Sequence, residues 1–227
     1  MNSHIIPAIL PKDFNDLVDH VEKVRLGTEW IQIDICDGKL TPEASWPYRK
    51  PDNTFEMIVR EDQALPAWET VEYEIDLMVD KPEVAVEDWV SAGASRIIVH
   101  AGAHGDVREA ILSLRGRVEV GLAITLDTTV EDIRAVGVEI GGPESDIQFI
   151  QVMGIRRIGF QGQQFDAEVL DVIREIRDAY PDITITVDGG VSLDNFVSLF
   201  EAGAERLVVG SAIFNTENPL EALEAFK

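Results

Sequence analysis

The sequence predicts an α/β protein, folded as a single-domain (β/α)8 TIM barrel over residues 1–227. Strand-like and helix-like segments alternate from one end of the chain to the other, with eight of each. Most of the strand-like segments are almost continuously apolar, which is typical of parallel strands buried on both faces. Eight right-handed βαβ crossovers in succession close a sheet into a barrel, which needs about 250 residues. An open, doubly wound sheet is the structural alternative, because alternation by itself does not distinguish the two.

The expected strands are short and rich in β-branched residues. They span residues 4–10, 30–35, 71–79, 95–101, 119–125, 147–153, 183–188 and 206–212. The segments that follow the second and sixth strands are longer and more polar than the others. Because the loops after the strands build the active face of a barrel, we expect these two loops to be functional.

Each strand is followed by a segment with helical spacing or helix-terminal signals. In the first of these, apolar residues recur at i, i+3, i+4 and i+7 after Asp13, a suitable N-cap. The expected helices span residues 13–24, 53–60, 84–92, 106–114, 129–136, 166–180, 193–202 and 219–226. Gly93, Gly137 and Gly203 follow three of them, at the position where glycine commonly ends a helix.

The composition limits the class of protein and its partners. The formal net charge is −23, so the surface repels nucleic acid and anionic lipid, and neither is an expected partner. No apolar run approaches the ~20 residues of a membrane span, and no basic region precedes an apolar one at the N-terminus. The single Cys36 cannot form an internal disulfide, which agrees with a reducing compartment. These features predict a cytoplasmic location.

Two strands end on a carboxylate directly before a glycine-containing turn. Asp34 is the next-to-last residue of the second expected strand, and Asp188 ends the seventh. In one parallel barrel both side chains would point into the same opening, where they could remove a proton from one face of a carbon and return one to the other. The structural alternative is that each carboxylate caps the turn that follows it.

Glycine turns follow the sixth, seventh and eighth strands. Backbone amides exposed by glycines can approach a phosphate closely, and barrel phosphate sites commonly lie after the last two strands. The residues concerned are Gly159, Gly162, Gln163, Gly189, Gly190, Gly210 and Ser211. Ordinary turn chemistry, in which glycine supplies a positive φ, is the alternative.

Six segments that span almost the whole chain resemble the ribulose-phosphate 3-epimerase family. In order, they read IIPAIL, IQIDICDGKLTP, YEIDLM, GFQGQ, VDGGV and GSAIF. The resemblance implies a ribulose-phosphate-binding barrel in which Asp34 and Asp188 act as acid and base on a phosphorylated ketose. It also implies phosphate held by the glycine turns, a divalent metal that stabilises an enediolate, and a homo-oligomer. Further substrate contacts are expected from Gln32, Asp76 and Met78.

The sequence departs from the family at both metal-binding histidines, since Gln32 and Asp76 stand at those positions. With Asp34 and Asp188 they would form an all-oxygen set, which favours Mg²⁺ or Mn²⁺ over Zn²⁺. Alternatively no metal binds, and the carboxylates hydrogen-bond a substrate or neighbouring donors. The weak amide ligand slightly favours this metal-free alternative. Without a metal the carboxylates should repel one another, and at least one should hold a proton at neutral pH.

Basic residues are few in this chain, yet Arg156 and Arg157 stand side by side after the sixth strand. One interpretation is that Arg156 contacts a second anionic group of the substrate; the other is a salt bridge to nearby acids. His100 ends the fourth strand and could reach the barrel opening, although packing inside the barrel is the favoured interpretation.

An epimerase or isomerase that acts on a phosphorylated sugar is the favoured function. The alternative is a non-catalytic barrel that binds or senses a phosphorylated metabolite. A decarboxylase of the orotidine-phosphate type would need a lysine where Met78 stands, so this chemistry is not expected.

Overall fold

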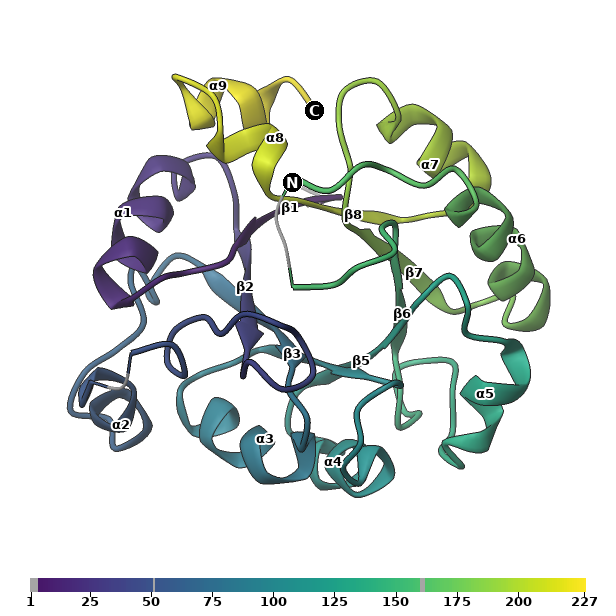
Figure 1. Cartoon of the computed structure of the whole chain (residues 1–227), viewed down its shortest axis with the longest axis horizontal. Coiled ribbons are helices and arrows are strands. Elements are labelled where there is room, and N and C mark those ends of the chain that lie inside the picture. Colours follow the sequence, from purple (N-terminus) through teal and green to yellow (C-terminus); the bar gives the residue numbers. More distant parts are fainter. Residues whose placement is uncertain (1–3, 51, 160–161) are drawn as a thin grey trace.

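The computed structural model describes residues 4–50, 52–159 and 162–227. Eight parallel strands form a closed barrel in the order β1 to β8, with β8 paired to β1 (Figure 1). The strands are β1 (Ile5–Ile9), β2 (Trp30–Cys36), β3 (Glu72–Met78), β4 (Arg96–His100), β5 (Glu119–Ile124), β6 (Phe149–Met153), β7 (Thr184–Asp188) and β8 (Arg206–Val209). All eight predicted strands are confirmed, and the closed sheet rules out the open one.

Helices surround the barrel (Figure 1). They are α1 (Phe14–Val24), α2 (Thr54–Val59), α3 (Pro82–Ser91), α4 (Val107–Leu114), α5 (Val130–Ala135), α6 (Val169–Ala179), α7 (Phe196–Ala202), α8 (Ser211–Phe214) and α9 (Pro219–Glu224). The Asp13 side chain caps α1 by accepting from the Asp16 amide, as predicted. Nothing in the described part of the chain is both helical and sufficiently long and apolar to span a bilayer.

Helix boundaries differ from the sequence predictions by up to three residues, and one short helix was not predicted. Helix α7 begins at Phe196 and not at Leu193. Helix α6 begins at Val169 and not at Asp166, because the Asp166 carboxylate accepts from the Glu168 amide and holds this segment as a turn. Helix α3 begins earlier than expected, at Pro82, since proline fits the first helical turn. The short helix α8 was missed, because the apolar run of β8 continues into it without a polar break.

Opposite charges close the amino-terminal end of the barrel. Arg96 begins β4, and its guanidinium donates to Glu119 at 2.6 Å and to Glu74 at 3.3 Å. It also stacks over the Trp30 ring, 3.5 Å from the centroid. These side chains fill the interior of the barrel at its amino-terminal end.

The barrel interior leaves no room for a side chain at Gly121. A Cβ atom at this glycine would come within 2.4 Å of the Phe149 ring. We expect Gly121→Ala to lower the free energy of unfolding by roughly 1–3 kcal/mol, measured by urea denaturation. Gly102→Ala is the matched control, because a Cβ there meets nothing within 4 Å. Equal stability of the two variants would contradict the packing described.

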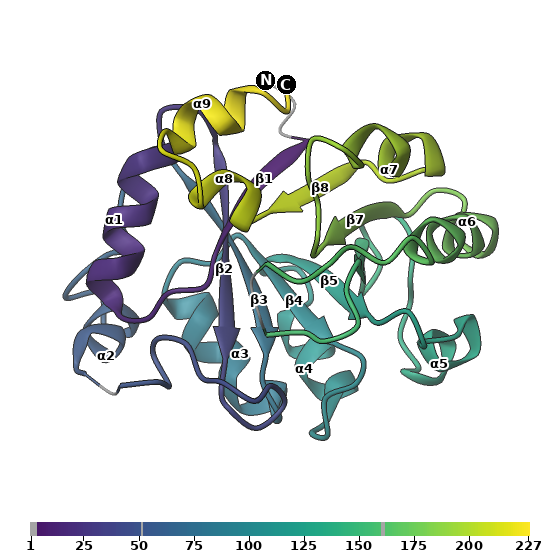
Figure 2. The same cartoon turned by 45° about the horizontal axis from the view of Figure 1, so that its top comes forward.

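Two long loops meet over the carboxyl-terminal end of the strands. One follows β2 and the other follows β6, and Figures 1 and 2 show both on this side of the barrel. A Cβ at Gly159 would lie 2.5 Å from the Thr41 side chain, so the two loops are in close contact there. The loop after β2 is held to its strand by Ser45, whose hydroxyl donates to the Asp34 carbonyl at 2.9 Å.

Candidate active site

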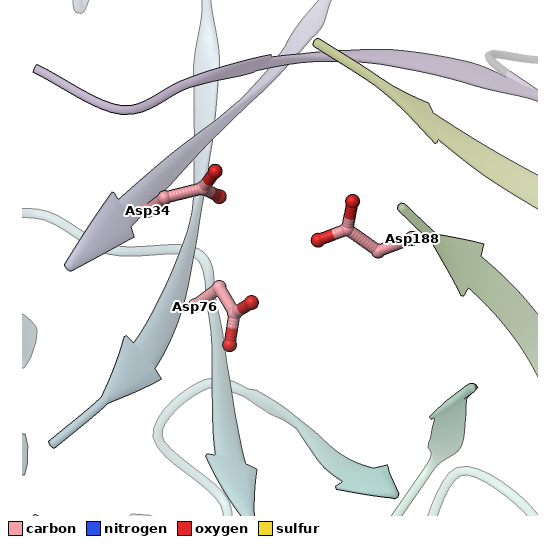
Figure 3. A group of neighbouring side chains, drawn as sticks. All are labelled: Asp34, Asp76 and Asp188. Carbon is pink, nitrogen blue, oxygen red and sulfur yellow. The ribbon is translucent and has the colours of Figure 1, made fainter. Parts of the chain in front are cut away.

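Three aspartates from different strands converge inside the barrel (Figure 3). Asp34 lies on β2, Asp76 on β3 and Asp188 on β7, and one oxygen of each lies within 4.8 Å of the others. Asp34 and Asp76 are paired in register between neighbouring strands, so their side chains share the inner face. The strand-end positions seen in the sequence therefore do place Asp34 and Asp188 in one site.

A single amide joins Asp34 to Asp188. The Gln32 Nε2 group donates to Asp34 Oδ1 at 2.8 Å and to Asp188 Oδ2 at 2.9 Å. Both of its hydrogens are used in these contacts, since an amide NH₂ has two. Gln32 is fully buried, and it acts as a bridge beneath the two carboxylates.

Asp76 has separate donors. His100 Nε2 lies 2.7 Å from Asp76 Oδ1, and Gln151 Nε2 donates to Asp76 Oδ2 at 3.2 Å. All three side chains are buried. The three acids are therefore divided into a bridged pair, Asp34 and Asp188, and a third carboxylate that is held independently.

Burial and mutual repulsion change the acidity of the bridged pair. Burial, followed by the charges of Asp188 and Asp76, raises the pKa of Asp34 well above its usual value. Burial, followed by the charge of Asp76, raises the pKa of Asp188 to about 7. The direction agrees with the repulsion expected from the sequence. Both shifts favour the protonated carboxyl form, as expected where two buried acids lie side by side and titrate as a pair.

A cavity opens above the bridged pair at the carboxyl end of the strands. Its wall combines the two acids, the predicted glycine turns and several apolar side chains. The lining residues are Ala8, Leu10, Asp34, Met78, Met153, Ile155, Gly159, Gly162, Gln163, Asp188, Gly189, Gly190, Val191, Val208, Gly210 and Ser211. The acids and all three glycine turns therefore face one space.

The turn after β7 requires glycine at both positions. Gly189 and Gly190 have φ values of 103° and 70°, a region that other residues rarely adopt. A Cβ at Gly190 would also come within 2.7 Å of the Phe165 backbone. The chain after β7 therefore passes close to the β6–α6 loop, and its backbone lies directly on the cavity wall.

Three residues that were predicted to contact the substrate lie outside the cavity wall. Gln32 and Asp76 are buried below the cavity and are absent from its wall. The Arg156 guanidinium is exposed and outside the wall; it binds Asp166 at 2.8 Å, as well as Glu168 and Asp127. For Arg156 the structure therefore favours the salt-bridge interpretation.

Two residues of the buried network were missed. His100 was assigned to packing, but it contacts Asp76 directly. Gln151 received no role, although it is a polar residue at an inward position of β6, between Phe149 and Met153. An isolated amide in an otherwise apolar strand was the signal that could have identified it, because a buried polar side chain needs a partner.

The residues present fit a hard divalent ion. Three carboxylate oxygens lie close enough together to share one cation, and oxygen-only ligands suit Mg²⁺ or Mn²⁺. The Gln32 carbonyl oxygen is buried and has no hydrogen-bond partner. Rotation of this amide by half a turn would present that oxygen to the acids as a fourth ligand, in place of the donor group that now bridges them.

The fold and the geometry define a class, that of (β/α)8 barrels whose site lies at the carboxyl ends of the strands. A sequence model of the Ribulose-phosphate 3 epimerase family matches residues 4–214. The chain belongs to this family. It is 30% identical over 226 residues to the cytoplasmic isoform of ribulose-phosphate 3-epimerase from Oryza sativa subsp. japonica, covering 98% of this chain and 92% of the relative. Ribulose-phosphate 3-epimerase from Synechocystis is 31% identical over 240 residues, with the same coverage.

Solved structures agree on the fold. A crystal structure of KGPDC from Streptococcus mutans has a TM-score of 0.71 at 13% identity, covering 100% of this chain and 96% of that one. A 3-hexulose-6-phosphate synthase has a TM-score of 0.67 at 18% identity, covering 98% and 97%. At these identities the likeness concerns the barrel alone.

Proposed function

We propose that the protein is a sugar-phosphate epimerase that moves a proton at the carbon next to a carbonyl, as in ribulose-phosphate 3-epimerase. One observation carries the proposal: Asp34 and Asp188, bridged by Gln32, line the same cavity as the glycine turns after β6, β7 and β8. Family membership supports the substrate class, a phosphorylated ketose such as ribulose 5-phosphate.

The two carboxyl groups would act from opposite faces of the substrate carbon. Asp188 in its ionised form removes the C3 proton. The C–H electron pair forms the C2–C3 double bond, and the carbonyl π pair moves onto the oxygen to give an enediolate. Asp34 in its protonated form, which burial and the neighbouring charges favour, delivers its proton to the other face of C3 and inverts that centre. Solvent then restores the starting protonation, and the reverse reaction exchanges the two roles.

The phosphate would be bound by the turns that hold Gly189, Gly190 and Gly210. Their backbone approaches the cavity without intervening side chains, so amide groups can reach a dianion. Ser211 adds a hydroxyl on the same wall. This arrangement would place the phosphate beside the acids and favour one orientation of the sugar.

When a divalent ion is bound, it would neutralise charge that develops on the substrate oxygens, and Asp34, Asp76 and Asp188 would hold it. We expect Mn²⁺ to bind at one ion per chain, measured by equilibrium dialysis. No binding at millimolar Mn²⁺ would contradict the oxygen-ligand assignment.

A second candidate is a barrel that binds a phosphorylated metabolite without turnover. It is favoured by the replacement of both family histidines with Gln32 and Asp76. The two candidates are separated by incubating the protein with ribulose 5-phosphate, and with a panel of other ketose phosphates, while NMR monitors the C3 epimer. Formation of the epimer supports the enzyme. A melting-temperature increase with sugar phosphate and no epimer supports the binding protein.

The acid pair also predicts a pH dependence. In the site without a bound metal, burial and the charge of Asp76 raise the pKa of Asp188 to about 7, so the fraction of ionised base decreases as pH falls through this value. We expect kcat/KM for epimerisation to fall about tenfold for each pH unit below roughly 6, as for any single required base. A pH profile that stays flat down to pH 5 would contradict this assignment.

A further inference from the structure

Asp76 differs from the other two acids in its position. It is fully buried below the cavity, whereas Asp34 and Asp188 line the cavity wall. Its charge nevertheless acts on both of them, since it contributes to the raised pKa of each. The location of the Asp76 carboxylate therefore affects the reacting pair without contact with a substrate.

The donors around Asp76 are few. Both hydrogens of the Gln32 amide are committed to Asp34 and Asp188, so Gln32 cannot also serve Asp76 in this arrangement. Asp76 instead accepts from His100 at 2.7 Å and from Gln151 at 3.2 Å. The shorter contact is the one to His100. A carboxylate oxygen can only accept here, so the His100 Nε2 atom carries the hydrogen.

The register of the sheet explains how His100 reaches this position. Asp76 on β3 is paired with Ile98 on β4, and Ile98 packs inside the barrel. His100 lies two residues further along β4, so its side chain also points inward, one step nearer to the cavity. The imidazole therefore covers Asp76 from the neighbouring strand, and Gln151 reaches it from β6.

A freely rotating Asp76 would compete with the reacting pair. Its carboxylate lies within 4.8 Å of both other acids, and these two accept from the Gln32 amide. Without its own donors it would be a buried acceptor lacking a partner, and a contact with Gln32 Nε2 would relieve that cost. Such a contact would remove the bridge from either Asp34 or Asp188.

We propose that His100 is a positioning residue in the metal-free site, where it holds the Asp76 carboxylate and thereby keeps the Gln32 bridge between Asp34 and Asp188 intact. The inference rests on the proposed epimerase function. It assigns to His100 an effect on the alignment of the acid pair, and none on the binding of the phosphate, because His100 is absent from the cavity wall that the glycine turns form.

The test compares two substitutions that differ in one hydrogen-bond donor. His100→Leu removes the donor at similar volume, whereas His100→Gln retains an N–H group that can reach Asp76. We expect His100→Leu to lower kcat for epimerisation by roughly 10–100-fold, the range found when a partner that orients a functional ligand is removed. KM should change less than about threefold, because the phosphate contacts are untouched. His100→Gln should recover most of the lost kcat.

His104→Leu is the matched control, since His104 is exposed and pairs with Asp80 away from the acids. It should behave as the wild type. The inference is overturned if His100→Leu keeps the wild-type kcat, or if His100→Gln loses as much kcat and thermal stability as His100→Leu, which would indicate packing alone. A wild-type protein without epimerase activity would overturn the proposed function and this inference together, and the wild-type assay distinguishes that outcome from the other two.

Discussion

Asp188→Asn is expected to lower kcat for C3 epimerisation by about 10²–10⁴-fold, the usual contribution of a general acid or base. The asparagine amide can still accept from Gln32, so the shape of the site is retained while the proton acceptor is lost. NMR with ribulose 5-phosphate measures the loss. Asp34→Asn should have an effect of similar size, because each direction of the reaction needs both groups.

The same substitution should increase stability, which separates it from a folding defect. The pKa of Asp188 is higher in the folded protein than in the unfolded chain, so the folded state binds the proton more tightly. The free energy of unfolding therefore falls as pH rises from about 4 to about 7. Above pH 7 the destabilisation by the ionised Asp188 carboxylate is complete and no longer changes with pH. Asp188→Asn removes this charge and should melt above the wild type at pH 8, by roughly 2–4 °C for each kcal/mol gained. Retained activity, or a lower melting temperature, would contradict the account.

Ser211→Asp is expected to raise KM for a sugar phosphate by about 100-fold or more. Ser211 lines the cavity next to the glycine turns, and a carboxylate there would repel the phosphate dianion. Two unit charges 4 Å apart near a protein surface interact by about 4 kcal/mol, which exceeds the ~2.7 kcal/mol that a hundredfold change requires. Inorganic phosphate should likewise raise the melting temperature of the wild type but not that of the variant.

Asn215→Asp provides the matched control for this charge. Asn215 is exposed, follows α8 and is absent from the cavity wall, so the added carboxylate is screened by solvent and salt. Its effect on KM should remain below about threefold. If both variants bind the substrate equally well, the phosphate does not lie beside Ser211.

The sequence was sufficient to predict the barrel. The strands were identified because most are short apolar runs, and eight crossovers of one hand favoured a closed barrel over the open sheet that remained as the alternative. The errors in the predicted fold lie mainly at helix boundaries, because individual side-chain contacts determine where a helix begins and ends. Helix α6 starts later than predicted because the Asp166 carboxylate accepts hydrogen bonds from the Glu168 amide and the Arg156 guanidinium. These contacts cannot be predicted from the local sequence pattern.

The site was predicted in part. Asp34 and Asp188 were found from their positions at strand ends, and the glycine turns were found from the order of the strands. The role of Gln32 was not found, since a ligand and a bridging donor have the same sequence signature. The contact between His100 and Asp76 depends on the stagger between β3 and β4, which spacing along one chain cannot supply.

Arg156 illustrates the opposite error. Because basic residues are rare in this acidic chain, Arg156 was interpreted as a contact for an anionic substrate group. Its actual partners, Asp166 and Glu168, are two of the many acidic residues of the protein itself. In a chain of net charge −23, an exposed arginine has many possible partners within the protein. The excess of acidic residues therefore favours a salt bridge within the protein over a substrate contact for Arg156.

The central claim is that one carboxyl group removes the proton from one face of C3 and a different carboxyl group donates a proton to the opposite face. Epimerisation of ribulose 5-phosphate in D₂O, stopped after a small fraction of one equilibration and analysed by NMR, tests it directly. The account predicts that the first product molecules carry deuterium at C3, because the acid that returns the proton has exchanged with solvent. Product that retains the substrate hydrogen at C3 would require a single group to transfer it, and would contradict the roles of Asp34 and Asp188.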